Sequence, residues 1–204
     1  MSGITRNDLL RSIAETGYNV GFGAKKHFAT YDIVEKMPGW IGFLSMAFGI
    51  YALVFEQLSG KFLAATLSIV GICSFYITQY DRDKSKYDQA GSQLTIIYND
   101  LRETYRALKS YEGTDVMPFY ERFKSLEADY YATSISKQIL FSDWYAHYKF
   151  FWQQQIDWVE EQKNFRFLRD KIPLSFIVAV VGSTILLISL VYTGAFSNAA
   201  MPCP

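Results

Sequence analysis

The sequence has few of the residues from which catalytic and metal sites are built. It holds two cysteines and two histidines in 204 residues, and His27 and His147 share no motif with a cysteine. Two cysteines cannot form a disulfide framework, so they do not reveal the redox compartment. The glycines of "GYNVGFGAKKH" lack the spacing of a phosphate-binding loop. We therefore expect no metal, no cofactor and no enzymatic activity.

Charged side chains are missing from three stretches: residues 40–55 (16 residues), 62–80 (19) and 172–196 (25). A membrane-spanning helix needs about 20 predominantly apolar residues. The first stretch is short, but only "EQLSGK" separates it from the second, which predicts a tight helical hairpin. The alternative is a buried hairpin of a soluble protein. A chain of this size is too small to cover three helices that are apolar all round, so we favour spans.

Basic residues predict the orientation of these spans, because they concentrate on the cytoplasmic side. They flank the start of the first span, the end of the second and the start of the third, whereas the hairpin loop has only Lys61 and the C-terminal tail has none. We expect an all-α membrane protein: a cytoplasmic N-terminal amphipathic helix (1–37), a transmembrane hairpin (38–80), a cytoplasmic helical domain (81–171), a third transmembrane helix (172–196) and an external tail (197–204).

The expected cytoplasmic domain carries 14 Lys/Arg and 15 Asp/Glu and shows helical periodicity. Apolar residues at steps of three and four predict a first helix, with Gly91 as its weak point and Gly113 as its end; they are Leu94, Ile97, Tyr98, Leu101, Tyr105 and Leu108. Pro118 favours the first turn of a new helix, and we expect this helix to end within residues 132–136. We expect one long helix over 138–169 to lead into the third span, with Pro173 at a kink or a fresh start.

The aromatic stretch "DWYAHYKFFW" (143–152) falls within that long helix. Its steps predict that Tyr145, Tyr148 and Trp152 share one buried face with Phe141, while Phe150 points elsewhere. On a continuous helix Trp152 would lie roughly 30 Å from the membrane, which excludes an interface belt. Packing is favoured over ligand stacking, since an aromatic stripe at helical spacing is usually buried.

Small and hydroxylated residues mark one face of the second span. Gly71, Ser74 and Thr78 lie at steps of three and four and lead to Asp81 or Arg82 at the cytoplasmic end. Close helix packing is favoured over an aqueous path for such residues. The spans contain no charge, which argues against a proton relay. If a pore exists, these five residues are the candidates to line it.

Residues 9 to about 108 resemble the SLATT family of small bacterial membrane effectors. The similar features are "GYN" and "GAKKHF" in the N-terminal segment, the tight two-span hairpin and the long helix after it. The third span is an addition to the two-span plan of the family. With it, the chain looks most like the channel effectors of Hailong-type anti-phage systems. The resemblance implies the bacterial inner membrane, a homo-oligomer with a tetramer favoured, and control by a nucleotide or single-stranded oligonucleotide from a companion nucleotidyltransferase.

The resemblance also implies a cytoplasmic collar around the pore, formed by Tyr18, Asn19, Lys25, Lys26, His27 and Asp32. Helix capping and packing are the alternative roles for these residues. For an anionic ligand we expect phosphate contacts from seven cations and base stacking from three aromatic residues: Arg102, Arg106, Lys109, Arg122, Lys124, Lys137 and Lys149, with Trp144, Tyr148 and Trp152. The near-neutral charge of this domain requires a local pocket rather than a broad nucleic-acid surface.

The sequence is therefore compatible with two alternative functions. The first is a ligand-gated channel whose pore lies on the symmetry axis of several copies, because one chain has too few spans to enclose it. The second is a non-conducting membrane scaffold that recruits a soluble partner through its cytoplasmic helices. A membrane enzyme acting on lipids lacks a nucleophile or metal cluster at any span end.

Overall fold

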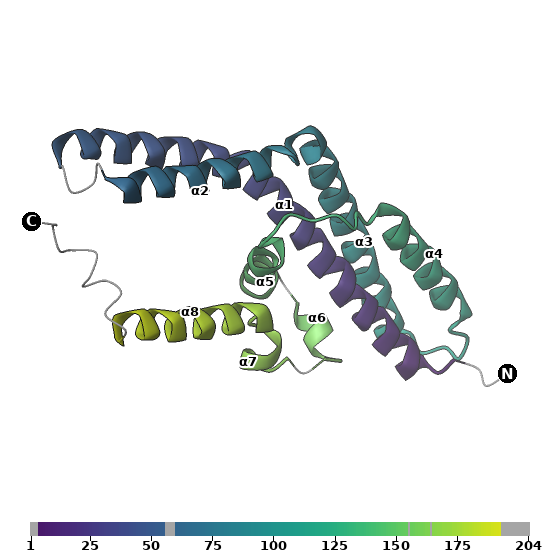
Figure 1. Ribbon diagram of the computed structural model, residues 1–204. Coiled ribbons are helices and arrows are strands. Elements are labelled where there is room, and N and C mark those ends of the chain that lie inside the picture. The colour runs from purple at the N-terminus through teal and green to yellow at the C-terminus, as the bar shows by residue number, and fades with distance from the viewer. Residues whose placement is uncertain (1–3, 56–59, 155, 164, 193–204) are drawn as a thin grey trace, which may run out of the picture. The chain divides into compact units, whose positions relative to one another are not determined.

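The computed structural model describes residues 4–55, 60–154, 156–163 and 165–192, and these ranges contain helices and no strand. The chain divides into two units, Met1–Asn164 and Phe165–Pro204, each described here by itself. The predicted all-α fold is confirmed (Figure 1). The hairpin loop is only partly visible, because residues 56–59 lie outside the described ranges, as does the predicted external tail.

One helix connects the N-terminal segment with the first apolar stretch. Helix α1 (Arg6–Val54) is 49 residues long and continues through Pro38. Thr5 caps its start by accepting the backbone N–H of Asp8 at 3.2 Å. Helix α2 (Lys61–Thr78) runs back beside the far half of α1 (Figure 1). The predicted boundary between residues 37 and 38 therefore separates two parts of one helix.

Helix α3 (Lys84–Ser110) follows α2 after a short 3-10 turn, η2 (Asp81–Asp83), and packs antiparallel along the near half of α1. The predicted apolar stripe of α3 is confirmed, since all six of its residues are buried. Gly91 does not interrupt the helix. The ring of Phe28 on α1 lies 3.0 Å from where a Cβ of residue 91 would be, so glycine allows the two helices to approach closely.

Helix α4 (Met117–Thr133) packs on α3. Its first turn contains Pro118, as predicted, and the Asp115 carboxylate accepts the N–H of Met117 at 3.0 Å. Phe123 and Leu126 are its buried residues. The helix ends at Thr133, so the predicted break over residues 132–136 is confirmed.

The long helix predicted over residues 138–169 is wrong. The chain instead forms α5 (Ser142–Gln153), α6 (Asp157–Glu160) and α7 (Phe167–Asp170). Both Phe150 of α5 and Trp158 of α6 are buried against α1 and α3, and Gln154 between them is extended. The estimate that Trp152 lies about 30 Å from the membrane loses its basis, because it assumed one continuous helix.

The predicted buried face of the aromatic stretch is also wrong. Phe150 is fully buried, whereas Phe141, Tyr148 and Trp152 have 53%, 53% and 66% of their surface exposed. The residues of α5 that contact the core are Ser142, Ala146 and Phe150. Two of these are small, so they let α5 approach α1, and the larger aromatic side chains stay outside.

Among the described residues, two helical stretches are long and apolar enough to cross a membrane. They are α1 and Leu63–Ser110, whose apolar part belongs to α2. Their apolar side chains face outward: Phe43, Met46 and Ile50 of α1 are each more than half exposed, as are Ile72 and Phe75 of α2. A soluble monomer rarely exposes an apolar surface of this extent. The protein is therefore an all-α membrane protein.

In the second unit, α8 (Leu174–Tyr192) is a helix of 19 residues without a charge. It begins afresh at Pro173, whose carbonyl accepts the N–H groups of Phe176 and Ile177 at 3.0 and 3.2 Å. At 1.5 Å per residue its length is about 28 Å, close to the thickness of a bilayer core. A third span over residues 172–196 stays a prediction.

Candidate functional site

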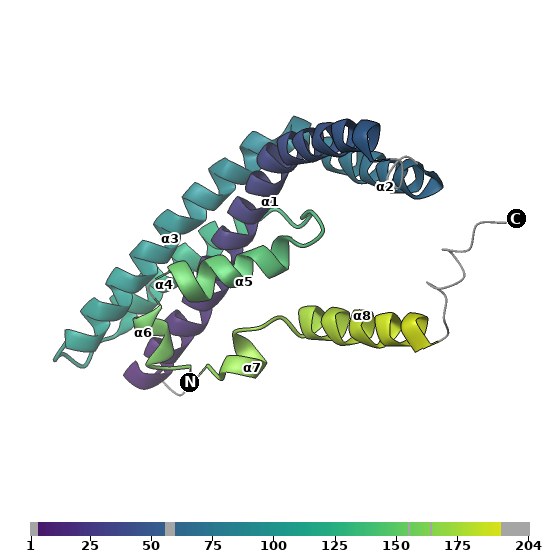
Figure 2. The ribbon, with the colours of Figure 1, turned by 90° about the vertical axis from the view of Figure 1, so that its left-hand side faces the viewer.

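The helices packed along the near half of α1 meet the hairpin at one place, which we call the junction. It is formed by the middle of α1, the end of α2, the start of α3 and the segment of residues 134–141 between α4 and α5 (Figures 1 and 2). Its buried core consists of Val34, Ile77, Tyr80, Tyr87 and Ile139. Side chains from all four parts of the chain therefore pack together where the spans begin.

Three tyrosines attach the 134–141 segment to α2 and α3. The Tyr80 hydroxyl donates to the Gln138 carbonyl at 3.3 Å, and the Tyr87 hydroxyl donates to the Lys137 carbonyl at 2.8 Å. The Tyr76 hydroxyl accepts the backbone N–H of Leu140 at 3.2 Å. Side chains at and just beyond the end of α2 and at the start of α3 therefore satisfy backbone groups of this loop.

Two side chains attach the same segment to α1. The Thr30 hydroxyl, fully buried, donates to the side-chain oxygen of Gln138 at 2.5 Å. His27, 3% exposed, accepts the backbone N–H of Ile135 on Nε2 at 3.0 Å, and its Nδ1 lies 2.7 Å from the Gly23 carbonyl. Burial lowers the pKa of His27; the Gly23 carbonyl opposes this effect and the Lys26 charge adds to it.

The predicted collar residues lie on α1, but they face different neighbours. Lys26 forms an ion pair with Asp143 of α5 at 2.7 Å, and Asp32 pairs with Lys149 of α5 and with Lys36. Burial alone would raise the pKa of Asp32, but its bonds to Lys149 and Lys36 outweigh this and lower it. Tyr18 packs edge-on against Phe150, and Asn19 is exposed. These contacts give most of the collar a packing role within one chain.

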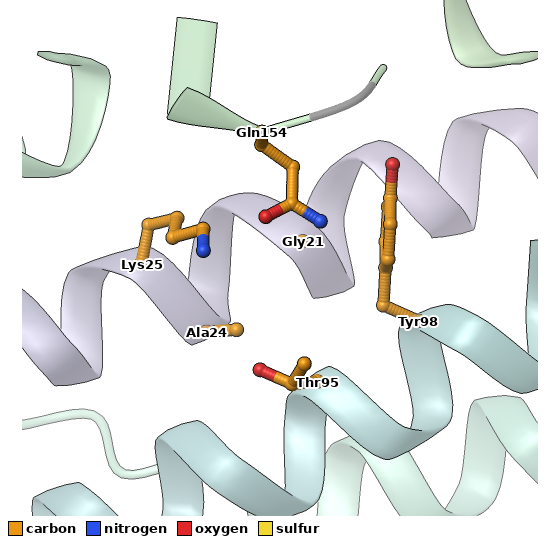
Figure 3. A pocket seen from close by; sticks show the side chains of 6 residues that line it. All are labelled: Gly21, Ala24, Lys25, Thr95, Tyr98 and Gln154. Atoms are coloured by element: carbon orange, nitrogen blue, oxygen red, sulfur yellow. The ribbon is translucent and has the colours of Figure 1, made fainter. Parts of the chain in front are cut away.

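Lys25 enters a narrow crevice between α1 and α3. Figure 3 shows Lys25 and Gln154 converging over Gly21 and Ala24, with Thr95 and Tyr98 on the α3 side. Burial, followed by the charge of Lys149, lowers the pKa of Lys25. The crevice leaves no room for a water molecule, so it does not admit a nucleotide.

A wider pocket of about 270 Å³ opens beside the junction. It is lined by Asn19, Phe22, Lys26 and His27 of α1, by Tyr130, and by the start of the 134–141 segment. Typical small-molecule pockets measure roughly 300–1,000 Å³, so this one is too small for a whole oligonucleotide. Among the described residues, no group of three His, Cys, Asp or Glu side chains is placed to hold a metal ion.

The structure does not gather the predicted ligand-binding residues into one site. Four of the cations have carboxylate partners: Lys109 with Glu161, Arg122 with Asp100, Lys124 with Glu127, and Lys149 with Asp32. Lys137 lies over the ring of Tyr80, 4.7 Å from its centre. Arg102 and Arg106 remain on α3 without an ion pair among the described residues, and the Nε of Arg102 is buried without a hydrogen-bond partner there. The three stacking candidates lie on α5.

The predicted pore-lining residues lie on an open surface of the single chain. A Cβ at Gly71 would have no neighbour within 4 Å, and Thr78 is exposed with its hydroxyl bonded to the Phe75 carbonyl at 2.8 Å. Ser74 is half-buried, while Asp81 and Arg82 are exposed just beyond the end of α2. Asp81 pairs with Lys84 at 3.0 Å.

The sequence did not reveal three residues that build the junction. Thr30, Tyr87 and Gln138 take part in two of the hydrogen bonds that hold the 134–141 segment, and none of them belongs to a recognisable motif. The only available signal was indirect. Tyr87 follows the core residue Tyr80 by seven positions, and Thr30 precedes the core residue Val34 by four, which are helical spacings. Their partners lie 50 or more residues away in the chain, so spacing alone could not pair them.

Comparison with known proteins gives one match. The model of a protein family described as SMODS and SLOG-associating 2TM effector domain 6 (SLATT_6) matches residues 4–180. No curated protein and no solved structure matches the chain. The matched range includes the hairpin, the junction and helices α3 to α7.

Proposed function

The chain belongs to the SLATT_6 family of two-span effector domains, and from this membership we propose that it is a pore-forming effector of bacterial anti-phage defence. It opens a conducting path through the inner membrane, with its N-terminus and residues 81–171 in the cytoplasm. The resulting depolarisation arrests or kills the infected cell. The family describes a membrane effector; conduction and its control are our proposal.

The observation that carries the proposal is the exposed hairpin. Positions 42, 49 and 71 are glycines at which a Cβ would meet nothing within 4 Å, so the small-residue faces of both span helices have no partner within the described chain. Such faces allow helices to pack closely in a membrane. A two-helix hairpin cannot enclose a pore by itself, which favours a ring of copies, with a tetramer as the expected number.

Gating follows from the junction. A ligand on the cytoplasmic helices changes conduction only if it binds two packings of the junction with different affinity. The 134–141 segment provides the connection, since it is bonded to α1, α2 and α3. For a nucleotide or oligonucleotide signal we assign phosphate contacts to Arg102 and Arg106, which have no carboxylate partner among the described residues.

The test follows membrane potential with a voltage-sensitive dye in bacteria that express the chain with and without its companion nucleotidyltransferase. Depolarisation by the chain alone, suppressed by an active synthase, identifies a channel held closed by the nucleotide. Depolarisation only with the synthase identifies an opener. A potential that stays constant in every combination, including phage infection, contradicts the channel and leaves the scaffold.

The ligand contacts have a separate test. Reversing the charge of Arg102 and Arg106 to glutamate is expected to abolish the response to the synthase. The matched control is Lys86→Glu, an exposed cation on the same helix that belongs to neither predicted site. Equal responses of the Arg102/Arg106 double variant and the control would show that these arginines do not bind the signal.

A further inference from the structure

Helix α5 presents an aromatic face to its surroundings. Its core side consists of Ser142, Ala146 and Phe150, and the opposite side carries no charge. The exposed positions continue into the preceding loop, where Leu140 is 61% exposed. The whole patch, here called the α5 aromatic face, consists of Leu140, Phe141, Trp144, Tyr148 and Trp152. A surface helix in contact with water has the opposite arrangement.

The charged residues of α5 point toward α1. Asp143 pairs with Lys26, and Lys149 pairs with Asp32. In the second pair both side chains are about 85% buried, being 14% and 15% exposed. The polar groups of α5 are thus satisfied within the protein, while the exposed side is apolar.

The start of α5 lies level with the ends of the spans. The N–H of Leu140 donates to the hydroxyl of Tyr76, which belongs to the last turn of α2. Lys149 of α5 pairs with Asp32, which also pairs with Lys36, four residues before Trp40 at the start of the apolar stretch of α1. Four residues of helix cover about 6 Å. The headgroup layer on each side of a bilayer is of similar thickness, roughly 5–8 Å.

Contacts with α1 show which side of α5 is nearer to the spans. Asp143 and His147 contact Lys26 and Phe22, which are farther from the spans along α1. Lys149, whose Nζ lies 4.6 Å from the centre of the Tyr145 ring, pairs with Asp32, which is nearer. Tyr148 and Trp152 follow Tyr145 at steps of three and seven, so they share its side. The aromatic side of α5 is therefore the side nearer to the spans.

The direction of α5 fits this position. Helix α5 is seen end-on in Figure 1, where α2 lies lengthwise, and it lies lengthwise in Figure 2. It therefore runs across the direction of the hairpin. A helix with this orientation beside a spanning hairpin lies along the membrane surface.

We propose that α5 is an interfacial helix: its aromatic face is inserted into the cytoplasmic leaflet, between the headgroups and the acyl chains. Its partner is the lipid surface. Aromatic side chains favour this layer, and an amphipathic helix in the interface buries its apolar face there. The inference depends on the hairpin spanning the membrane and not on conduction, so a silent channel assay leaves it intact.

The experiment uses the full chain reconstituted in vesicles of phosphatidylethanolamine and phosphatidylglycerol. In a Cys73→Ser, Cys203→Ser background, single spin labels are attached at Tyr148→Cys and Trp152→Cys. Collision rates with oxygen, which partitions into lipid, and with a nickel chelate, which stays in water, are measured at each label. Tyr131→Cys on α4, 69% exposed in the structure, is the water-exposed control, and Ile50→Cys, 59% exposed, is the reference within a span.

Labels at 148 and 152 are expected to resemble position 50, with an oxygen-to-nickel ratio several-fold higher than at position 131. Nickel access equal to that at position 131 would place α5 in water and overturn the proposal. Protection from both reagents would show a protein interface with a second copy. Nickel access that disappears only on addition of a single-stranded oligonucleotide would show base stacking. Either result also overturns it.

A second measurement keeps the native side chains. Brominated lipids quench tryptophan fluorescence at short range, so the wild-type chain is compared with Trp152→Tyr in the same vesicles. We expect the quenched fraction to fall when Trp152 is replaced. An unchanged quenched fraction would contradict insertion of Trp152, whatever the labelled variants show.

Discussion

His27 of α1 accepts the backbone N–H of Ile135 on Nε2 at 3.0 Å, across 108 residues of sequence. The other ring nitrogen, Nδ1, lies 2.7 Å from the Gly23 carbonyl, which can only accept. The ring is therefore neutral, with its hydrogen on Nδ1. Lys26 beside it and Tyr87, whose ring centre lies 6.2 Å away on α3, offer no negative charge to stabilise an imidazolium.

This bond makes the junction sensitive to acid. Burial lowers the pKa of His27 in the folded state, so the unfolded chain binds the proton more readily. The stabilisation is complete above the ordinary histidine pKa of about 6.5 and is lost as pH falls below it. We expect a loss of at most about 2 kcal/mol by pH 5, because pH 5 lies about 1.5 units below the ordinary pKa and each unit corresponds to about 1.4 kcal/mol.

Unfolding in detergent micelles, followed between pH 8 and 5, checks this expectation. His27→Gln keeps an acceptor for Ile135 but does not titrate, so its stability should vary less with pH than that of the wild type. His147→Gln is the control, because His147 lies outside the junction and should keep the wild-type slope. The same slope in all three proteins would assign the acid sensitivity to another group.

The bond between Thr30 and Gln138 predicts non-additive mutations. Gln138→Ala leaves the fully buried hydroxyl of Thr30 without its acceptor, at an expected cost of about 1–3 kcal/mol. Thr30→Val removes that hydroxyl, so the double variant should cost less than the sum of the single variants, by about 0.5–2 kcal/mol. Denaturant titration of the four proteins measures the coupling. Strict additivity would mean that the bond contributes nothing.

The pair of Asp32 and Lys149 should matter more than pairs at the surface. Asp32→Asn leaves Lys149 largely buried without its counter-charge, and we expect a loss of about 2–4 kcal/mol. Because the pKa of Asp32 is lowered, the contribution is present at neutral pH and lost only as pH falls through the acidic range. Glu127→Gln, which removes the exposed pair with Lys124, should cost less than about 1 kcal/mol. Comparable losses in thermal unfolding would contradict the role of burial.

Sequence periodicity predicted helix α3 well and helix α5 badly, for one physical reason. On α3 the apolar residues occupy a single stripe, so the pattern itself identifies the buried face. On α5 aromatic residues occur around most of the helix, and the face against α1 is set by the small residues Ser142 and Ala146. The pattern of large apolar residues therefore indicated the exposed side. It also gave no signal for the end of α5 at Gln153.

The junction could not be read from the sequence, because its contacts join distant segments of the chain. The resemblance directed attention to His27 and Asp32 but not to Ile135 or Lys149, their partners. Neither hydrogen-bonding loops nor ion pairs between helices have a periodic signature. The predicted spans, by contrast, follow from composition alone, and the exposed hairpin agrees with them.

Two glycines of α1, Gly21 and Gly23, lie two residues apart. Replacing each of them by alanine should change the stability of the protein in opposite directions. A Cβ at Gly21 would lie 2.8 Å from the rings of both Phe150 and Tyr98, closer than carbon atoms can pack. At Gly23 the nearest atoms are 3.7 and 3.8 Å away, an ordinary contact with Tyr130 and Leu94. Gly21→Ala should therefore destabilise the protein by about 1–3 kcal/mol by separating α5 and α3 from α1.

Gly23→Ala should be neutral or stabilising by up to about 1 kcal/mol, because alanine favours the helix and its backbone carbonyl still accepts from His27. Both variants carry the same added methyl group on the same helix, so intrinsic helix propensity cannot explain a difference between them. Thermal unfolding of the purified chain in detergent compares them directly. If Gly21→Ala is as stable as Gly23→Ala, then α1, α3 and α5 do not pack as closely as the rings of Tyr98 and Phe150 require.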